Sequence, residues 1–143
     1  MVARRADDAI RVTAVLVGWV VDTVTTSVVG LPLIASFGVD PTDQAGLDRL
    51  NGAPEFLLVS LALGLACTAV GGFVTAHLAR GAELRNAVVM GIASAGSALL
   101  LALTSPGGPP LWYMAAGTAL TVPAAALGGL ARERTRISTG NIK

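Results

Sequence analysis

The sequence has 143 residues, of which 53% are hydrophobic, 13% are charged and 4% are aromatic. A soluble domain usually carries about 25% charged residues, so this composition argues against an ordinary soluble enzyme and against a disordered chain. A formal net charge of +1 gives no basic excess for a nucleic-acid partner. The single cysteine, Cys67, excludes an intrachain disulfide and a multi-cysteine metal site.

Long apolar windows dominate the chain, and they lie at about 12–36, 56–79, 86–104 and 111–131. Of the ten basic and nine acidic residues, only Asp22 lies inside a window. Each window is long enough to cross a hydrocarbon core about 30 Å thick. The last two windows have no charge on any face, whereas helices of a soluble bundle show a polar stripe. We therefore expect an all-α, polytopic bundle of four transmembrane helices, forming a single domain over residues 1–143 and embedded in a lipid bilayer.

The basic residues predict the orientation of this bundle. Nine of the ten lie in the N-terminal tail, the 80–85 connection and the C-terminal tail: Arg4, Arg5, Arg11, Arg80, Arg85, Arg132, Arg134, Arg136 and Lys143. The 37–55 segment holds only Arg49 among several acidic residues, and the 105–110 segment carries no charge. Because basic loops stay on the cytoplasmic side, we expect a multi-pass protein of the cell membrane with both termini in the cytoplasm. The first window is longer than the apolar part of a signal peptide, so we expect a permanent helix.

Turn residues shape the two outer connections. Asp40-Pro41 and Asn51-Gly52 predict a short extramembrane helix at about 41–50 in the first outer loop. The Pro- and Gly-rich segment 105–110 predicts a tight turn, so the last two helices should form an antiparallel hairpin. Pro123 should kink the last helix, because proline lacks the N–H that the helix needs.

Neither a metal site nor a catalytic set is predicted. The spacing of Asp40, Asp43 and Asp48 lacks the alternating oxygen ligands of a calcium loop. His77 is the only histidine and cannot by itself build a multi-histidine site, although one ligand paired across a dimer stays open as an alternative. We expect no cofactor and no enzymatic activity, since no Ser-His-Asp set can be assembled.

Small residues recur at four-residue spacing in every window. In lipid the hydrophobic effect does not drive helices together. Small residues let helix backbones approach closely, and the resulting van der Waals packing stabilises the bundle instead. These rows predict a compact bundle, and the glycines expected at the helix crossings are Gly18, Gly30, Gly64, Gly72, Gly91, Gly117 and Gly129.

Asp22 is the one acid expected at mid-membrane. On insertion scales it costs roughly 2.5–3.5 kcal/mol, so it must find partners or stay protonated. It shares a row with Gly18 and Gly30, which should face the bundle interior. Hydroxyl residues at similar depth complete a predicted polar cluster of Asp22, Thr25, Thr26, Thr68, Ser94, Ser97 and Thr121. The cluster has two possible roles. It can be structural, with a hydrogen bond of Asp22 that fixes the register of the helices. It can also be functional, as a relay for protons or cations or as a contact to a substrate.

At Gly71-Gly72-Phe-Val-Thr-Ala-His-Leu-Ala-Arg80, followed by a short polar turn into Gly91, the chain resembles small bacterial integral membrane proteins with four helices. An aspartate similar to Asp22 in the first helix is part of that resemblance. It implies a four-helix fold and a membrane location, and no activity, because the group is of uncharacterised function. The topology is also similar to that of the small multidrug transporters, but the acid here is Asp rather than Glu, and no residue is carried over.

Two functional hypotheses follow. The first is a non-enzymatic structural or partner-binding membrane subunit, packed in a homo-oligomer or a larger membrane complex. The second is a small oligomeric transporter or ion or proton conductor that uses Asp22. A lipid-modifying enzyme is less favoured, because the cytoplasmic face offers only His77, Arg80, Glu83 and Arg85.

Overall fold

The computed structural model describes residues 9–105 and 107–140, and side chains as far as residue 135. Within these ranges the chain is all-helical: α1 (Val12–Ser36), α2 (Gln44–Asn51), α3 (Pro54–Leu78), α4 (Glu83–Thr104) and α5 (Leu111–Gly140). The four long helices each contain a stretch that is long and apolar enough to cross a membrane. The prediction of an all-α chain with four apolar spans is therefore confirmed.

The helix ends differ from the apolar windows mainly at α5. This helix continues to Gly140, well past the expected end at about residue 131. Residues 131–134 are Ala-Arg-Glu-Arg, which are good helix formers, so the helix outlasts the apolar segment. At the start of α3, Pro54 occupies the first turn, where its missing N–H costs nothing.

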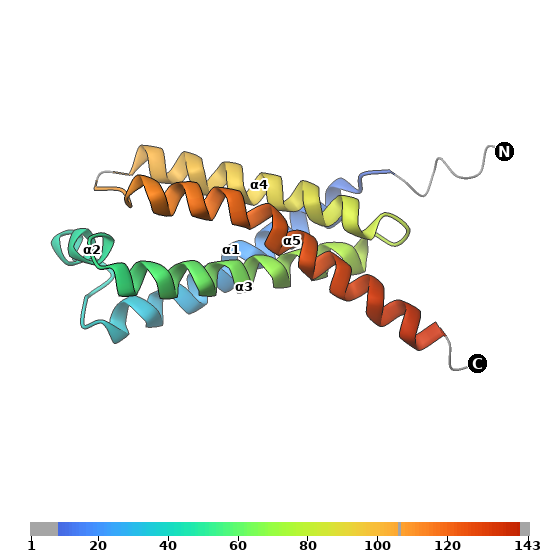
Figure 1. Ribbon diagram of the computed structural model, residues 1–143, viewed down its shortest axis with the longest axis horizontal. Helices are drawn as coiled ribbons and strands as arrows, with labels where there is room; N and C mark the ends of the chain where they lie inside the picture. The colour runs from blue at the N-terminus through green and yellow to red at the C-terminus, as the bar shows by residue number, and fades with distance from the viewer. Residues whose placement is uncertain (1–8, 106, 141–143) are drawn as a thin grey trace.

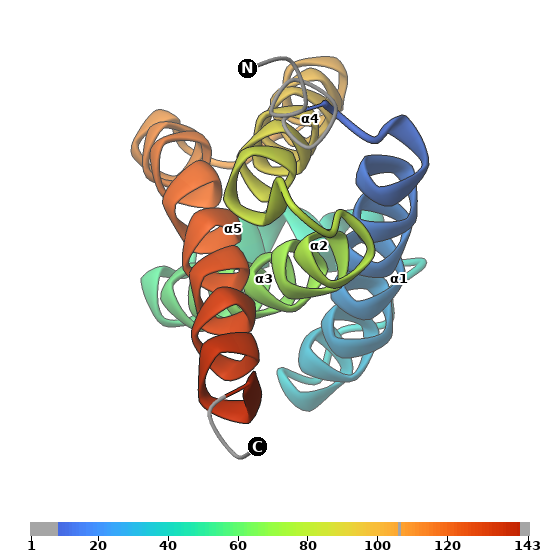
Figure 2. The same cartoon turned by 90° about the vertical axis from the view of Figure 1, so that its right-hand side faces the viewer.

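The helix α3 lies at the centre of the bundle (Figure 2). It packs against α1, α4 and α5, and α4 also packs against α1 and α5, whereas α1 and α5 do not touch one another in the described chain. The helix α5 changes direction in its middle (Figure 1), as expected from Pro123. One end of the bundle holds the start of α1, the end of α5 and the 79–82 turn, and we call it the 79–82 end. The other end, the α2 end, carries α2 and the turn between α4 and α5 (Figure 1).

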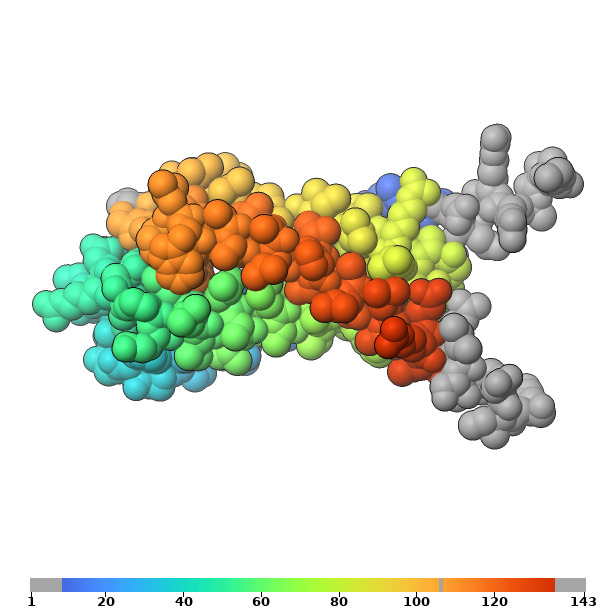
Figure 3. Space-filling view, viewed as in Figure 1, coloured from blue at the N-terminus to red at the C-terminus, as the bar shows by residue number. Residues whose placement is uncertain are grey.

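Most side chains of the long helices point outward. On α1, for example, Val20, Val24 and Val28 are 49%, 53% and 64% exposed. Exposed apolar area costs about 25 cal/mol per Å² in water but nothing comparable in hydrocarbon. Each long helix exposes large apolar side chains. The surface of the bundle is elongated along the helices (Figure 3). This surface is that of a multi-pass membrane protein rather than a water-soluble bundle.

The helix α2 begins at Gln44, later than the sequence predicts. The residue that caps it is Asp43, whose Oδ1 accepts the backbone N–H of Ala45 at 3.1 Å. Asp40, the expected cap, instead accepts the hydroxyl of Thr42 at 2.7 Å and the backbone N–H of Thr42 at 2.8 Å. These two bonds, the side-chain bond first, lower the pKa of Asp40 from its ordinary value of 3.8. Asp40 therefore forms a turn ahead of the helix.

Glycines let the helices pack closely in the half of the bundle toward the 79–82 end, which we call the closed half. A Cβ added at Gly71 would lie 2.8 Å from the carbonyl oxygen of Gly18, so α1 and α3 cross there almost backbone to backbone. A Cβ at Gly72 would strike the backbone of Ala125 on α5, and one at Gly91 would lie 2.8 Å from the Cβ of the same alanine. A Cβ added at Gly129 would likewise lie 2.8 Å from the Cβ of Ala87, and one added at Gly18 would strike the side chain of Thr75. An apolar core of Val15, Met90 and Ala125 fills the centre of this half.

The other half of the bundle, the open half, does not follow the packing prediction. A Cβ added at Gly30 or Gly64 would meet no atom of the described chain within 4 Å. One at Gly117 would meet only Leu61, at 3.8 Å. The expectation that these three glycines lie at close crossings is therefore wrong within one chain. The helices separate toward the α2 end, so the glycines there border open space rather than a neighbouring backbone.

Asn86 joins the start of α1 to the start of α4, and sequence reasoning missed it. Its side chain is fully buried, and its Oδ1 accepts the backbone N–H of Arg11 at 2.7 Å. Its Nδ2 donates to the carbonyl of Ala82 at 2.8 Å. Because an unpaired helix-start N–H is costly away from water, this amide holds the 79–82 end together.

Candidate functional site

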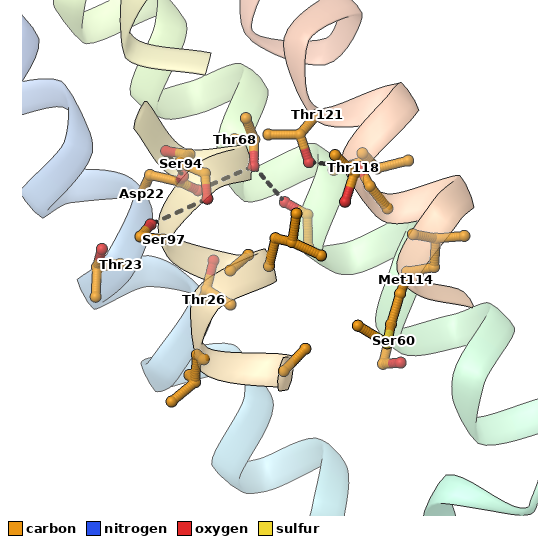
Figure 4. Close-up of a pocket in the computed structure, with 18 of the residues that line it drawn as sticks. Asp22, Thr23, Thr26, Ser60, Thr68, Ser94, Ser97, Met114, Thr118 and Thr121 are labelled. Atoms are coloured by element: carbon orange, nitrogen blue, oxygen red, sulfur yellow. Dashed lines mark hydrogen bonds between the residues drawn. The ribbon is translucent and has the colours of Figure 1, made fainter. Parts of the chain in front are cut away.

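Asp22 lies where the closed half meets the open half. Its side chain is only 6% exposed, and α1 presents it toward α3 and α4 (Figure 4). The hydroxyl of Thr68 on α3 donates to Oδ1 at 3.0 Å, and the hydroxyl of Ser94 on α4 donates to Oδ2 at 2.6 Å. Thr68 and Ser94 are each 6% exposed as well. One carboxylate thus links three helices at a buried point.

A cavity of about 450 Å³ begins at this carboxylate and extends toward the α2 end. All four long helices contribute to its wall (Figure 4). Its apolar part includes Leu61, Leu65 and Met114, and its volume is in the range of small-molecule sites. The hydroxyl groups of Thr26 and Thr118 line it from opposite helices, α1 and α5, which do not touch. The cavity therefore fills the space that the diverging helices leave.

Two aromatic side chains bridge the cavity walls. The indole Nε1 of Trp19 on α1 donates to the hydroxyl of Ser97 on α4 at 3.2 Å. The phenol oxygen of Tyr113 on α5 lies 3.1 Å from the hydroxyl of Ser60 on α3. All four residues line the cavity. The two bonds hold α1 to α4 and α3 to α5, the neighbouring helices that separate toward the α2 end.

A further link crosses the α2 end itself. The side-chain amide of Asn51 donates to the carbonyl of Gly107 at 2.8 Å, which ties α2 to the turn between α4 and α5. Gly107 has a φ of +65° and leaves no room for a Cβ beside Asp48. Glycine is therefore required where this turn meets α2.

The structure brings six of the seven expected cluster residues to the cavity. Thr68 and Ser94 each donate a hydrogen bond to the carboxylate of Asp22. Thr26, Ser97 and Thr121 line the same cavity, and no described hydrogen bond joins them to the carboxylate. The hydroxyl of Thr121 instead donates to the carbonyl of Gly117 at 2.7 Å. Thr25 is not part of the cavity wall. Its hydroxyl turns back to the carbonyl of Val21 at 2.7 Å. A threonine in a helix commonly makes this bond, so depth alone could not separate Thr25 from Thr26.

Sequence reasoning missed the aromatic part of the site. Neither Trp19 nor Tyr113 is among the residues of the predicted polar cluster. Trp19 lies three residues before Asp22, which places both side chains on one helix face, so helical spacing could have associated them. Tyr113 could not be found this way, because its place depends on how α5 packs against α3.

The chemistry of the site is that of a single acid among hydroxyls. The residues that line the cavity in the described chain include Asp22 and no Lys, Arg or His. His77 is exposed near the end of α3 in the opposite half. No group of three His, Cys, Asp or Glu side chains that could hold a metal ion is found among the described residues. The site can therefore accept hydrogen bonds and attract positive charge.

The chain gives no match in a comparison with protein-family models, with curated proteins or with solved structures. Functional conclusions therefore depend on the geometry of the site alone.

Proposed function

We propose that this protein is a small, non-enzymatic membrane carrier whose solute site is the cavity at Asp22. The observation that carries the proposal is the difference between the two halves of the bundle. On one side of the buried carboxylate of Asp22, near the middle of α1, lies an open cavity. On the other side, the helices of the described chain pack closely at glycines and leave no such space. A carrier needs a binding site that is reached from one side at a time, near the middle of the membrane.

The bonds across the cavity support movement of the helices about this site. Trp19–Ser97 and Ser60–Tyr113 are single hydrogen bonds between partly exposed groups, so breaking each costs about 1 kcal/mol. The closed half is held mainly by backbone contact at glycines around a small core of Val15, Met90 and Ala125, so few large side chains repack when its helices shift. Pro123 supplies a bend in α5 at the level where the halves meet.

The proposal includes an orientation. We place the 79–82 end and both termini in the cytoplasm of a cell, because nine of the ten basic residues belong to that side. The cavity then faces the outside.

One observation favours a second candidate, the structural or partner-binding membrane subunit. Gly96 on α4 is exposed, does not line the cavity and would meet no described atom within 4 Å of an added Cβ. It is free for close packing against another helix, in a homo-oligomer or a larger complex.

Thiol labelling tests the carrier proposal. In a Cys67→Ala background, Thr118→Cys reports on the cavity and Thr75→Cys, at a fully buried position, reports on the closed half. A membrane-impermeant maleimide should label Thr118→Cys in intact cells and Thr75→Cys only in inverted vesicles. Leu120→Cys, on the exposed apolar surface, is the control that should stay unlabelled.

The outcomes separate the candidates. Labelling of both cavity and closed-half cysteines, each from its own side, supports a carrier. Labelling of Thr118→Cys alone contradicts a carrier, because the closed half then never opens. If neither cysteine reacts from either side, the cavity is not a solute site and the subunit candidate is favoured.

A further inference from the structure

We propose that the solute of this cavity is a protonated amine with an apolar body, an inference that rests on the proposed carrier function and names its substrate class. Three features of the cavity point to this class: the charge of its wall, the unused hydrogen-bond capacity of Asp22 and the apolar surface around that carboxylate.

The charge of the wall selects against anions. Asp22 is the one acidic side chain among the lining residues in the described chain, and no basic side chain accompanies it. Its described partners, Thr68 and Ser94, are neutral hydroxyls that share no positive charge with it. An ionised carboxylate buried without a counter-charge is costly, and a bound cation removes that cost.

The carboxylate also retains acceptor capacity. Each of its oxygens accepts one described hydrogen bond, from Thr68 at Oδ1 and from Ser94 at Oδ2. A carboxylate offers about four acceptor sites, so roughly half remain for a ligand. An ammonium group carries several N–H donors and can use those sites, whereas a quaternary ammonium cannot.

The remaining wall suits an apolar body. Leu61, Leu65, Leu99 and Met114 line the cavity beyond the carboxylate. Trp19 lies one turn from Asp22 and contributes an aromatic ring, which attracts a cation placed over its face. A bare metal ion would leave the apolar wall unused and would find too few oxygen ligands, because it prefers about six. An amine on a short hydrocarbon or aryl chain uses both parts of the cavity.

A matched ligand series tests this inference on the full chain in phosphatidylcholine nanodiscs. The probes are 4-phenylbutylamine, 4-phenylbutanol and 4-phenylbutyrate, which share a body and differ in charge. Trp19 fluorescence reports binding in a Trp112→Phe background, because Trp112 does not line the cavity. Empty nanodiscs give the correction for partitioning into lipid.

We expect saturable binding of the amine, about tenfold or more tighter than that of the alcohol, and no saturable binding of the carboxylate. Asp22→Asn should reduce amine affinity to about that of the alcohol. If that variant does not fold, the comparison of amine with alcohol on the Trp112→Phe protein decides alone.

Two results would overturn the inference while leaving the carrier proposal standing. The first is equal affinity for amine and alcohol. The second is that the amine shows no saturable binding, although the labelling experiments succeed and Thr118→Cys and Thr75→Cys each react from their own side. Failure of those labelling reactions would instead contradict the carrier proposal itself, so the two failures are distinguishable.

Discussion

The hydroxyl of Ser94 lies 2.6 Å from Oδ2 of Asp22 and joins α4 to α1 at the closed end of the cavity. With the bond from Thr68 to Oδ1, it fixes the carboxylate between three helices. The bonds that hold the three helices together therefore also hold the carboxylate at the cavity wall.

Ser94→Ala should destabilise the bundle by about 1–2 kcal/mol, because one oxygen of a buried carboxylate loses its donor. Thr68→Val should cost a similar amount through the other oxygen. The measurement is reversible unfolding in mixed micelles. Thr104→Ala is the control, since the hydroxyl of Thr104 is exposed and bonds only to its own helix, and it should change stability by less than about 0.5 kcal/mol. Equal effects at positions 94 and 104 would contradict the role of the carboxylate as a helix link.

Gly72→Ala and Gly64→Ala form a matched pair on α3. The first should destabilise the protein by about 1–3 kcal/mol, because a methyl group at Gly72 strikes the backbone of Ala125. The second should be neutral within about 0.5 kcal/mol or slightly stabilising, because a methyl group at Gly64 meets no described atom within 4 Å. The same unfolding assay measures both. A reversed order would mean that the closed and open halves are assigned wrongly.

Gly64→Phe should fill the cavity without unfolding the protein. Gly64 lines the cavity, so the ring would occupy the space beside Asp22. We expect maleimide labelling of Thr118→Cys to fall at least about tenfold, with the far-UV circular dichroism unchanged. Gly96→Phe is the matched control, because Gly96 has similar free space but does not line the cavity. The cavity assignment fails if both variants slow labelling equally.

Asn86→Ala should loosen the start of α1. The variant removes the acceptor for the N–H of Arg11 and leaves that donor without its described partner, at a cost of about 1–3 kcal/mol. Hydrogen exchange of the Arg11 amide should become faster, while amides near Asp22 keep their protection. Unchanged exchange at Arg11 would show that the amide of Asn86 is not its essential partner.

The sequence was sufficient for the features that depend on one helix at a time. The apolar windows located α1, α3, α4 and α5, because a span must be long and apolar wherever it packs. The inward direction of Asp22 followed in the same way, since its own helix offers one face of small and polar residues and another rich in valine.

Features that depend on how helices cross could not be predicted. Gly64 and Gly72 lie in the same four-residue row of α3, yet Gly72 meets Ala125 and Gly64 borders the cavity, because α3 and its neighbours diverge along their length. Spacing cannot distinguish them. The Tyr113–Ser60 bond likewise depends on how α5 packs on α3.

The helix α1 should present one face to lipid and its Asp22 face to a cavity that water enters. Spin labels at Thr26→Cys and Val28→Cys in the Cys67→Ala background test it most directly, because Thr26 lines the cavity and Val28 is 64% exposed on the apolar surface. In liposomes, a water-soluble nickel complex should relax the label at position 26, and oxygen dissolved in lipid should relax the label at position 28. Relaxation of both labels by oxygen alone would contradict the account.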